Sequence, residues 1–138
     1  MRRISIFLFL VGLLPLSLSA QSAEDIEMYQ MNSHKLSKMK LELMSEVIGL
    51  DEEKRATFAK LYSTLLSERT AHAITKLNLS SEAAKSNSSS VGELMRITNE
   101  FAVIEASILG DIEKCVGAKM FTTFYYYDLV GLEEKLGR

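Results

Sequence analysis

The stretch GLDEEKR, residues 49–55, marks the boundary between two long amphipathic segments. Asp51 is typical of a helix N-cap, because its carboxylate accepts hydrogen bonds from backbone N–H groups that lack partners in the first turn. Glu52 and Glu53 favour the same start, since negative charge offsets the positive end of the helix dipole. Gly49 is expected to end the preceding helix in a left-handed conformation. A connection this short predicts an antiparallel helical hairpin.

Apolar spacing extends helices to both sides of this boundary. The first helix is predicted over residues 25–48, and its apolar stripe consists of Ile26, Tyr29, Leu36, Met39, Leu43 and Val47. The second is predicted over residues 51–77, and its face consists of Phe58, Leu61, Tyr62, Leu65, Arg69, Ala73 and Leu77. The spacing in both segments is that of helices packed along one side.

A polar segment follows the second helix. Residues 78–90 hold six serines and two asparagines, which predicts a loop or linker with one helical turn around residues 81–85. Ser90 and Glu93 form a capping-box pattern that predicts the start of a third helix, ending at about Val116. The apolar stripe of that helix consists of Leu94, Ile97, Phe101, Ile104, Ile108, Ile112 and Cys115.

A last helix is expected over residues 118–136, after a break at Gly117. The chain has one proline, Pro15, so no proline interrupts any of these segments. We therefore predict an all-α protein of three or four helices arranged as extended hairpins in one domain, residues 21–138.

The N-terminal residues have the pattern of a signal peptide. Arg2 and Arg3 precede an apolar run over residues 4–14, and small residues around Ala20 predict cleavage after residue 20, with residue 23 as an alternative site. The run is shorter than the about 20 residues that cross a bilayer. We expect a periplasmic or secreted protein with no membrane span after cleavage; the alternative is an uncleaved N-terminal anchor.

Composition excludes several classes of function. One cysteine and two histidines are too few for a disulfide framework or a conventional metal enzyme. The 16 basic residues, against 18 acidic ones, form no cluster, so nucleic acid is not an expected partner. No catalytic or nucleotide-binding motif is present, so we expect neither an enzyme nor a cofactor. Cys115 is expected to be a buried small side chain or half of an intermolecular disulfide.

Two patterns predict binding sites. Met28, Met31 and His34 recur every third residue, and thioether and imidazole ligands suit Cu(I); the alternative is a plain structural role. In the last helix, Tyr125, Tyr126 and Tyr127 cover about 200° of arc, so at least one must be exposed or lie in an interface. We expect these tyrosines and Phe124 to bind a partner; the alternative is that Phe124 and Tyr125 pack inside.

The layout of the chain resembles a known family. LDEEKR (residues 50–55) precedes a helix with Phe58 and Tyr62, and KMFTTFY (residues 119–125) opens the last helix. Together with the signal peptide and the serine-rich linker, this order resembles the LTXXQ-motif superfamily of periplasmic helical proteins, the Spy/CpxP-like group. Leu50 matches the leucine of the motif, Asp51 replaces its threonine, and Lys54 or Arg55 replaces its glutamine. One motif copy is visible, and residues 117–119 lack the start of a second.

The resemblance implies an all-α, cradle-like or bundled homodimer without ATP or cofactor, whose partners are envelope proteins or unfolded clients. Such proteins hold clients or sense envelope stress on a concave face that is typically basic. Because this chain is net acidic, a sensor or adaptor role stays open beside a chaperone role. The alternative function is a metal-binding resistance or sensor protein that uses Met28, Met31 and His34. A further alternative is a structural helical module for another envelope protein.

Overall fold

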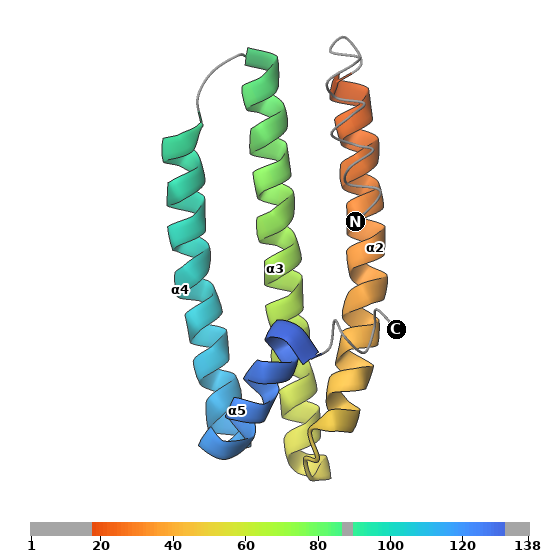
Figure 1. Cartoon of the computed structure of the whole chain (residues 1–138), viewed down its shortest axis with the longest axis vertical. Coiled ribbons are helices and arrows are strands. Elements are labelled where there is room, and N and C mark those ends of the chain that lie inside the picture. The colour runs from red at the N-terminus through yellow and green to blue at the C-terminus, as the bar shows by residue number, and fades with distance from the viewer. Residues whose placement is uncertain (1–17, 87–89, 132–138) are drawn as a thin grey trace.

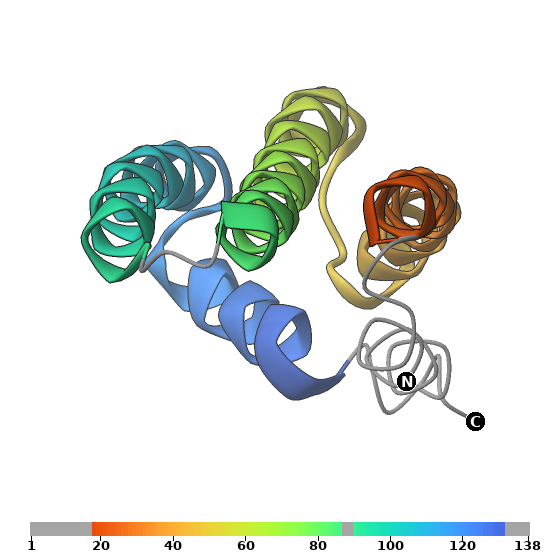
Figure 2. The ribbon, with the colours of Figure 1, turned by 90° about the horizontal axis from the view of Figure 1, so that it is seen from above.

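The computed structural model describes residues 18–86 and 90–131, and it is helical almost throughout these residues. The elements are α2 (Leu18–Val47), α3 (Glu52–Ser86), α4 (Val91–Val116), α5 (Ala118–Tyr126) and a short π-helix, η2 (Tyr127–Gly131). α3 lies between α2 and α4, and each neighbouring pair is antiparallel (Figure 1). The predicted all-α fold of extended hairpins is confirmed. Seen from above, α5 lies across one face of the layer that the three long helices form (Figure 2).

The α2–α3 connection is built around Asp51, as predicted. Its Oδ1 atom accepts a 2.9 Å hydrogen bond from the backbone N–H of Lys54, in the first turn of α3. The left-handed cap expected at Gly49 is wrong, because Gly117 is the positive-φ glycine of the described residues. The chain turns instead with Ile48 and Leu50 buried, and the N–H of Leu50 donates to the carbonyl of Ile48 at 2.9 Å.

α3 continues beyond its expected end at Leu77. Residues 78–86 are helical, so the helical turn predicted around residues 81–85 is confirmed and the loop predicted on either side of it is wrong for residues 78–80 and 86; residues 87–89 lie outside the described residues. No proline or glycine interrupts residues 77–86, and alanine, glutamate and lysine among them favour a helix. Serine content alone therefore does not end α3.

The start of α4 is at the predicted position, but its cap differs. Ser90 is the N-cap residue, and its side chain makes no capping hydrogen bond. The carboxylate of Glu93, expected to bond back to the cap, pairs with Arg96, which also binds Glu100. Arg96 offers Glu93 two charged N–H donors, and such bonds are stronger than one to a neutral backbone amide.

Gly117 separates α4 from α5, as expected. Its φ of +89° is a conformation that glycine adopts without strain and that other residues rarely take. Its N–H donates to the carbonyl of Glu113 at 2.8 Å, which closes α4. The last helix was expected to reach residue 136, but the α-helical part ends at Tyr126 and η2 follows; residues 132–138 lie outside the described residues.

The core occupies the end of the molecule where the two connections meet. Its buried members come from every element except η2: Met44, Ile48, Leu50, Phe58, Tyr62, Leu65, Leu66, Ile112, Val116 and Phe124. The Phe124 ring stands edge-on to Phe58 and Tyr62, with centroid distances of 5.5 and 5.3 Å. α5 covers only this end of α3 (Figure 1), so apolar side chains farther along the helices are less buried.

Candidate functional sites

The N-terminal half of α2 carries apolar side chains on a face turned away from α3. Met28, Met31, Leu36 and Met39 are between 41% and 57% exposed. At 100° per residue they fall within about 140° of arc. We call these four residues the outer stripe. The expectation that Leu36 and Met39 lie on the packed face of the helix is therefore wrong.

The residues of this half-helix that line the space toward α3 are polar. Gln30, His34, Ser37 and Lys38 line the space between α2 and α3, and apolar contact with the core begins at Leu41. Ile26 and Tyr29 of the predicted stripe are half-buried, whereas the outer stripe is exposed, so this part of α2 turns only some of its apolar side chains toward its own chain. Apolar side chains turned outward in this way are typical of a helix that binds something outside its own chain.

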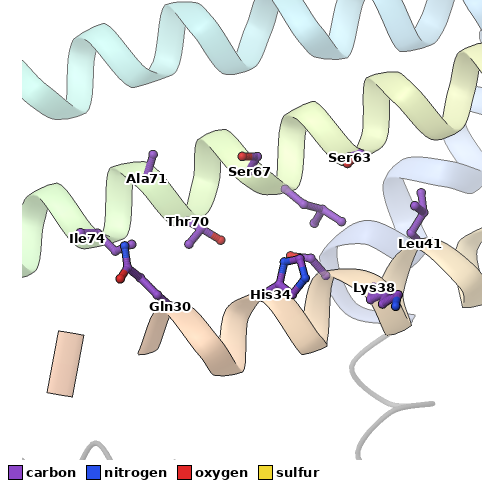
Figure 3. A pocket seen from close by; sticks show the side chains of 11 residues that line it. Gln30, His34, Lys38, Leu41, Ser63, Ser67, Thr70, Ala71 and Ile74 are labelled. Carbon is purple, nitrogen blue, oxygen red and sulfur yellow. The ribbon is translucent and has the colours of Figure 1, made fainter. Parts of the chain in front are cut away.

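A cleft of about 570 Å³ lies between the two helices. α3 lines it with small and polar side chains, Ser63, Ser67, Thr70 and Ala71, and with the apolar Leu66 and Ile74. Figure 3 shows His34 and Gln30 of α2 projecting toward this face of α3. Because the lining of α3 is so small, the two helices leave open space where larger side chains would interlock.

An ion-pair network around the buried Asp128 holds η2 against α3. Arg69 donates two hydrogen bonds of 2.8 Å to the two carboxylate oxygens of Asp128, and its Nε atom donates to Glu105 of α4 at 2.9 Å. The hydroxyl of Tyr62 donates to Asp128 at 3.3 Å. The Asp128 side chain is only 1% exposed. The network thus ties α3, α4 and η2 together at one point.

The surroundings shift the pKa values of two members of this network. Burial raises the pKa of Tyr62 above its ordinary value, and the charge of Asp128 and the hydrogen bond to it raise it further against the opposing charge of Arg69. Burial lowers the pKa of Arg69, but its hydrogen bonds and charge interactions with Asp128 and Glu105 outweigh burial and raise it overall. Tyr62 is therefore neutral and Arg69 charged over the whole physiological pH range.

His72 lies one turn farther along α3. Its ring stacks on Phe101 of α4, with a centroid distance of 4.3 Å and an interplanar angle of 4°. Burial lowers the pKa of His72 from its ordinary value of 6.5, and the charge of Lys76 lowers it further, while Glu105 opposes both. The neutral imidazole is thus the form that this stack favours.

The tyrosine run divides between core and surface. Phe124, expected to bind a partner, is fully buried, and this part of the prediction is wrong because its ring packs edge-on against the stacked rings of Phe58 and Tyr62. Tyr125 and Tyr126 are exposed, as the arc of the run requires, and Tyr125 stacks on Phe121. The rings of Tyr126 and Tyr127 meet edge-on at 5.4 Å. Tyr125 and Tyr126 stay candidates for partner binding.

The predicted metal ligands follow one another at one-turn spacing along α2, and all three side chains are exposed. Met28 and Met31 belong to the outer stripe, whereas His34 lines the cleft toward α3. Among the described residues, no group of three His, Cys, Asp or Glu side chains is arranged to hold a metal ion. Cys115 is partly buried, and its thiol donates to the carbonyl of Lys54 at 3.6 Å.

Sequence reasoning missed the ion-pair network, although a signal was present. Arg69 occurs on the otherwise apolar face of the second helix, and Asp128 lies between the apolar residues of the last one. Charged residues at such positions are almost never buried without a partner of opposite charge. Two lone opposite charges on two packing faces therefore predict a pair, whereas nothing in the sequence predicts the cleft.

Comparison of the chain with family models, curated proteins and solved structures finds no match. The resemblance to the LTXXQ-motif superfamily therefore stays a prediction. Within residues 18–86 and 90–131, no helix is long and apolar enough to cross a membrane.

Proposed function

We propose that this chain is a non-enzymatic, extracytoplasmic polypeptide-binding protein of the envelope stress response, acting without ATP as a chaperone or as a sensor or adaptor. The outer stripe is the observation that carries the proposal. Three of its four residues are methionines, whose flexible and polarisable side chains adapt to partners of different shape. The stripe also lies clear of the core, so a client bound there leaves the fold intact.

A second apolar surface supports the same function. Near the start of α4, the apolar side chains Val91, Leu94 and Met95 are exposed within about 100° of arc. Tyr125 and Tyr126 add exposed aromatic surface on α5, and such rings are common at protein interfaces. Exposed apolar side chains on three helices fit extended or partly unfolded polypeptides better than one compact partner. We propose a homodimer as the working unit, which sedimentation of the mature chain measures.

The test measures aggregation of a reduced, unfolding model client by light scattering, with the mature protein added and no ATP. We expect suppression by the wild type and a clear loss of suppression in the triple variant Met28→Gln/Met31→Gln/Met39→Gln. Val103→Gln, which changes an exposed apolar residue outside the stripe, is the matched control and keeps its activity. Equal suppression by the triple variant, or none by the wild type, contradicts the proposal.

Metal binding is the second candidate. The residues Met28 and Met31 are 46% and 57% exposed, and His34 is exposed one turn farther along α2. Soft thioether ligands select Cu(I), so the test is a Cu(I) titration of the mature protein under reducing conditions. Stoichiometric binding that Met28→Leu and Met31→Leu weaken supports this candidate. Absence of tight binding, or binding that neither substitution changes, excludes it.

A further inference from the structure

The cleft of about 570 Å³ between α2 and α3 differs in charge from a neighbouring cleft between the same two helices. The chain carries more acidic than basic residues, yet none of the residues that line this cleft is acidic. Lys38 supplies a positive charge, and His34 and Gln30 supply N–H donors. A second cleft farther along the same two helices is lined by Glu42, Glu46 and Glu52 with Arg55, again with Leu41. Acidic side chains thus line the second cleft and are absent from the lining of the first.

The polar groups of the first cleft have no hydrogen-bond partner among the described residues. Elsewhere in these helices, Ser45, Thr64 and Thr75 donate their hydroxyl protons to the carbonyl one turn earlier. No such bond is made by the four hydroxyl side chains in the cleft, which are those of Ser37, Ser63, Ser67 and Thr70. Lys38 likewise makes no ion pair with the described residues. These side chains are available as donors to a bound molecule.

Apolar side chains lie beside the donors. Leu66 is buried beneath the cleft, and Leu41 and Ile74 are partly buried at its sides. A volume of about 570 Å³ is within the range of small-molecule sites, which combine apolar walls with a few polar groups. The lining therefore suits a ligand that has both a charged and an apolar part.

We propose that this cleft binds a small organic oxyanion, a phosphate or carboxylate group attached to a short apolar group. Lys38 neutralises the charge, and His34 and the hydroxyls of Ser67 and Thr70 donate hydrogen bonds to the oxyanion. Leu66 and Ile74 contact the apolar part. The site is separate from the outer stripe, so it stands or fails independently of the polypeptide-binding function proposed above.

The test uses phenyl phosphate and benzoate as probes, followed by amide chemical shifts of the mature protein. Inorganic phosphate and acetate represent the charged parts of the two probes, and benzyl alcohol represents their apolar part. We expect one of the two complete probes to bind at least about tenfold more tightly than either part, because the two contacts add in one molecule. Shifts centred on residues 30–41 and 63–74 support the proposal, and which probe binds identifies the oxyanion.

Three substitutions separate the proposed site from weak adsorption. Lys38→Gln is expected to weaken binding about tenfold, which corresponds to loss of one charge-assisted contact. Ser67→Leu fills the cleft and abolishes binding without removing a charge. Lys114→Gln, an exposed lysine of α4, is the matched control and leaves binding unchanged. Shifts outside the cleft, equal binding of benzyl alcohol, or equal affinity of Lys38→Gln overturns the proposal.

Discussion

The Arg69–Asp128 pair makes a quantitative prediction for the variant Arg69→Met. The substitution removes two hydrogen bonds of 2.8 Å from a carboxylate that is 1% exposed. Asp128 then keeps one described partner, the hydroxyl of Tyr62 at 3.3 Å. Removing one partner of a buried pair costs about 3–5 kcal/mol, because the remaining charge stays in a poorly solvated place. Since the Arg69 side chain is 28% exposed, we expect the lower value, about 3 kcal/mol.

The second step of this experiment replaces both charges. Arg69→Met/Asp128→Leu leaves no buried charge, so the double variant should be more stable than Arg69→Met alone and closer to the wild type. Urea unfolding followed by circular dichroism gives the free energies of unfolding. The expected loss for Arg69→Met also lowers the melting temperature by about 10 °C.

Arg96 provides a matched control, since it also binds two carboxylates, those of Glu93 and Glu100. All three side chains are about half exposed, so Arg96→Met should leave the melting temperature nearly unchanged. An Arg69→Met variant as stable as the wild type would refute the reasoning. A double variant less stable than Arg69→Met would refute it as well.

Four further predictions follow from individual residues. The folded protein lowers the pKa of His72, so the stability that its neutral form contributes is present above pH 6.5 and is lost as the pH falls below 6.5. His72→Phe should reduce this pH dependence of stability, which urea midpoints measured on both sides of pH 6.5 would show. The folded protein raises the pKa of Tyr62, so the stability that its neutral form contributes is present below pH 10 and is lost as the pH rises above 10. Tyr62→Phe should remove this loss at high pH. Near neutral pH the same substitution should lower the free energy of unfolding by about 1 kcal/mol, because the hydrogen bond to Asp128 is gone. Gly117→Ala should destabilise by about 1–2 kcal/mol through strain at φ +89°, since an added Cβ meets no atom within 4 Å, and calorimetric melting measures this cost. Asp51→Ala should cost about 1 kcal/mol in urea unfolding through loss of its 2.9 Å bond to the N–H of Lys54, whereas Asp51→Asn should restore most of it.

The features of the fold that depend on one residue type could be predicted from the sequence. The Asp51 cap and the break at Gly117 each depend on one residue type whose conformation or hydrogen bonding has few alternatives. The end of α3 was missed because serine and asparagine only weakly oppose a helix, and no proline or glycine stops it before Ser86. Where the helix propensities of single residues are this weak, the adjacent helical turns decide whether the helix continues. A count of polar residues therefore does not locate the end of a helix.

The inward face of α2 was missed for a different reason. Periodicity shows that Leu36 and Met39 lie on one side of a helix, but it does not show which side meets the rest of the chain. Leu41, Met44 and Ile48 give a competing stripe, and the core at the α2–α3 connection selects it. The cleft follows from this choice, because turning the outer stripe away brings Gln30, His34 and Lys38 toward α3. The candidate sites on the N-terminal half of α2 therefore depend on how Leu41, Met44 and Ile48 pack near its C-terminal end.

The stabilising contacts are concentrated toward one end of the helices, which explains how one small fold can carry several binding surfaces. The core, the Arg69–Asp128 pair and the Gly117 break all lie toward the end where α5 covers α3. The opposite end of α2 contributes few buried apolar contacts, so substitutions in the outer stripe should change binding with little change in stability. This separation is what allows the client test to be interpreted: a triple stripe variant that melts like the wild type and fails to suppress aggregation has lost a surface and kept its fold.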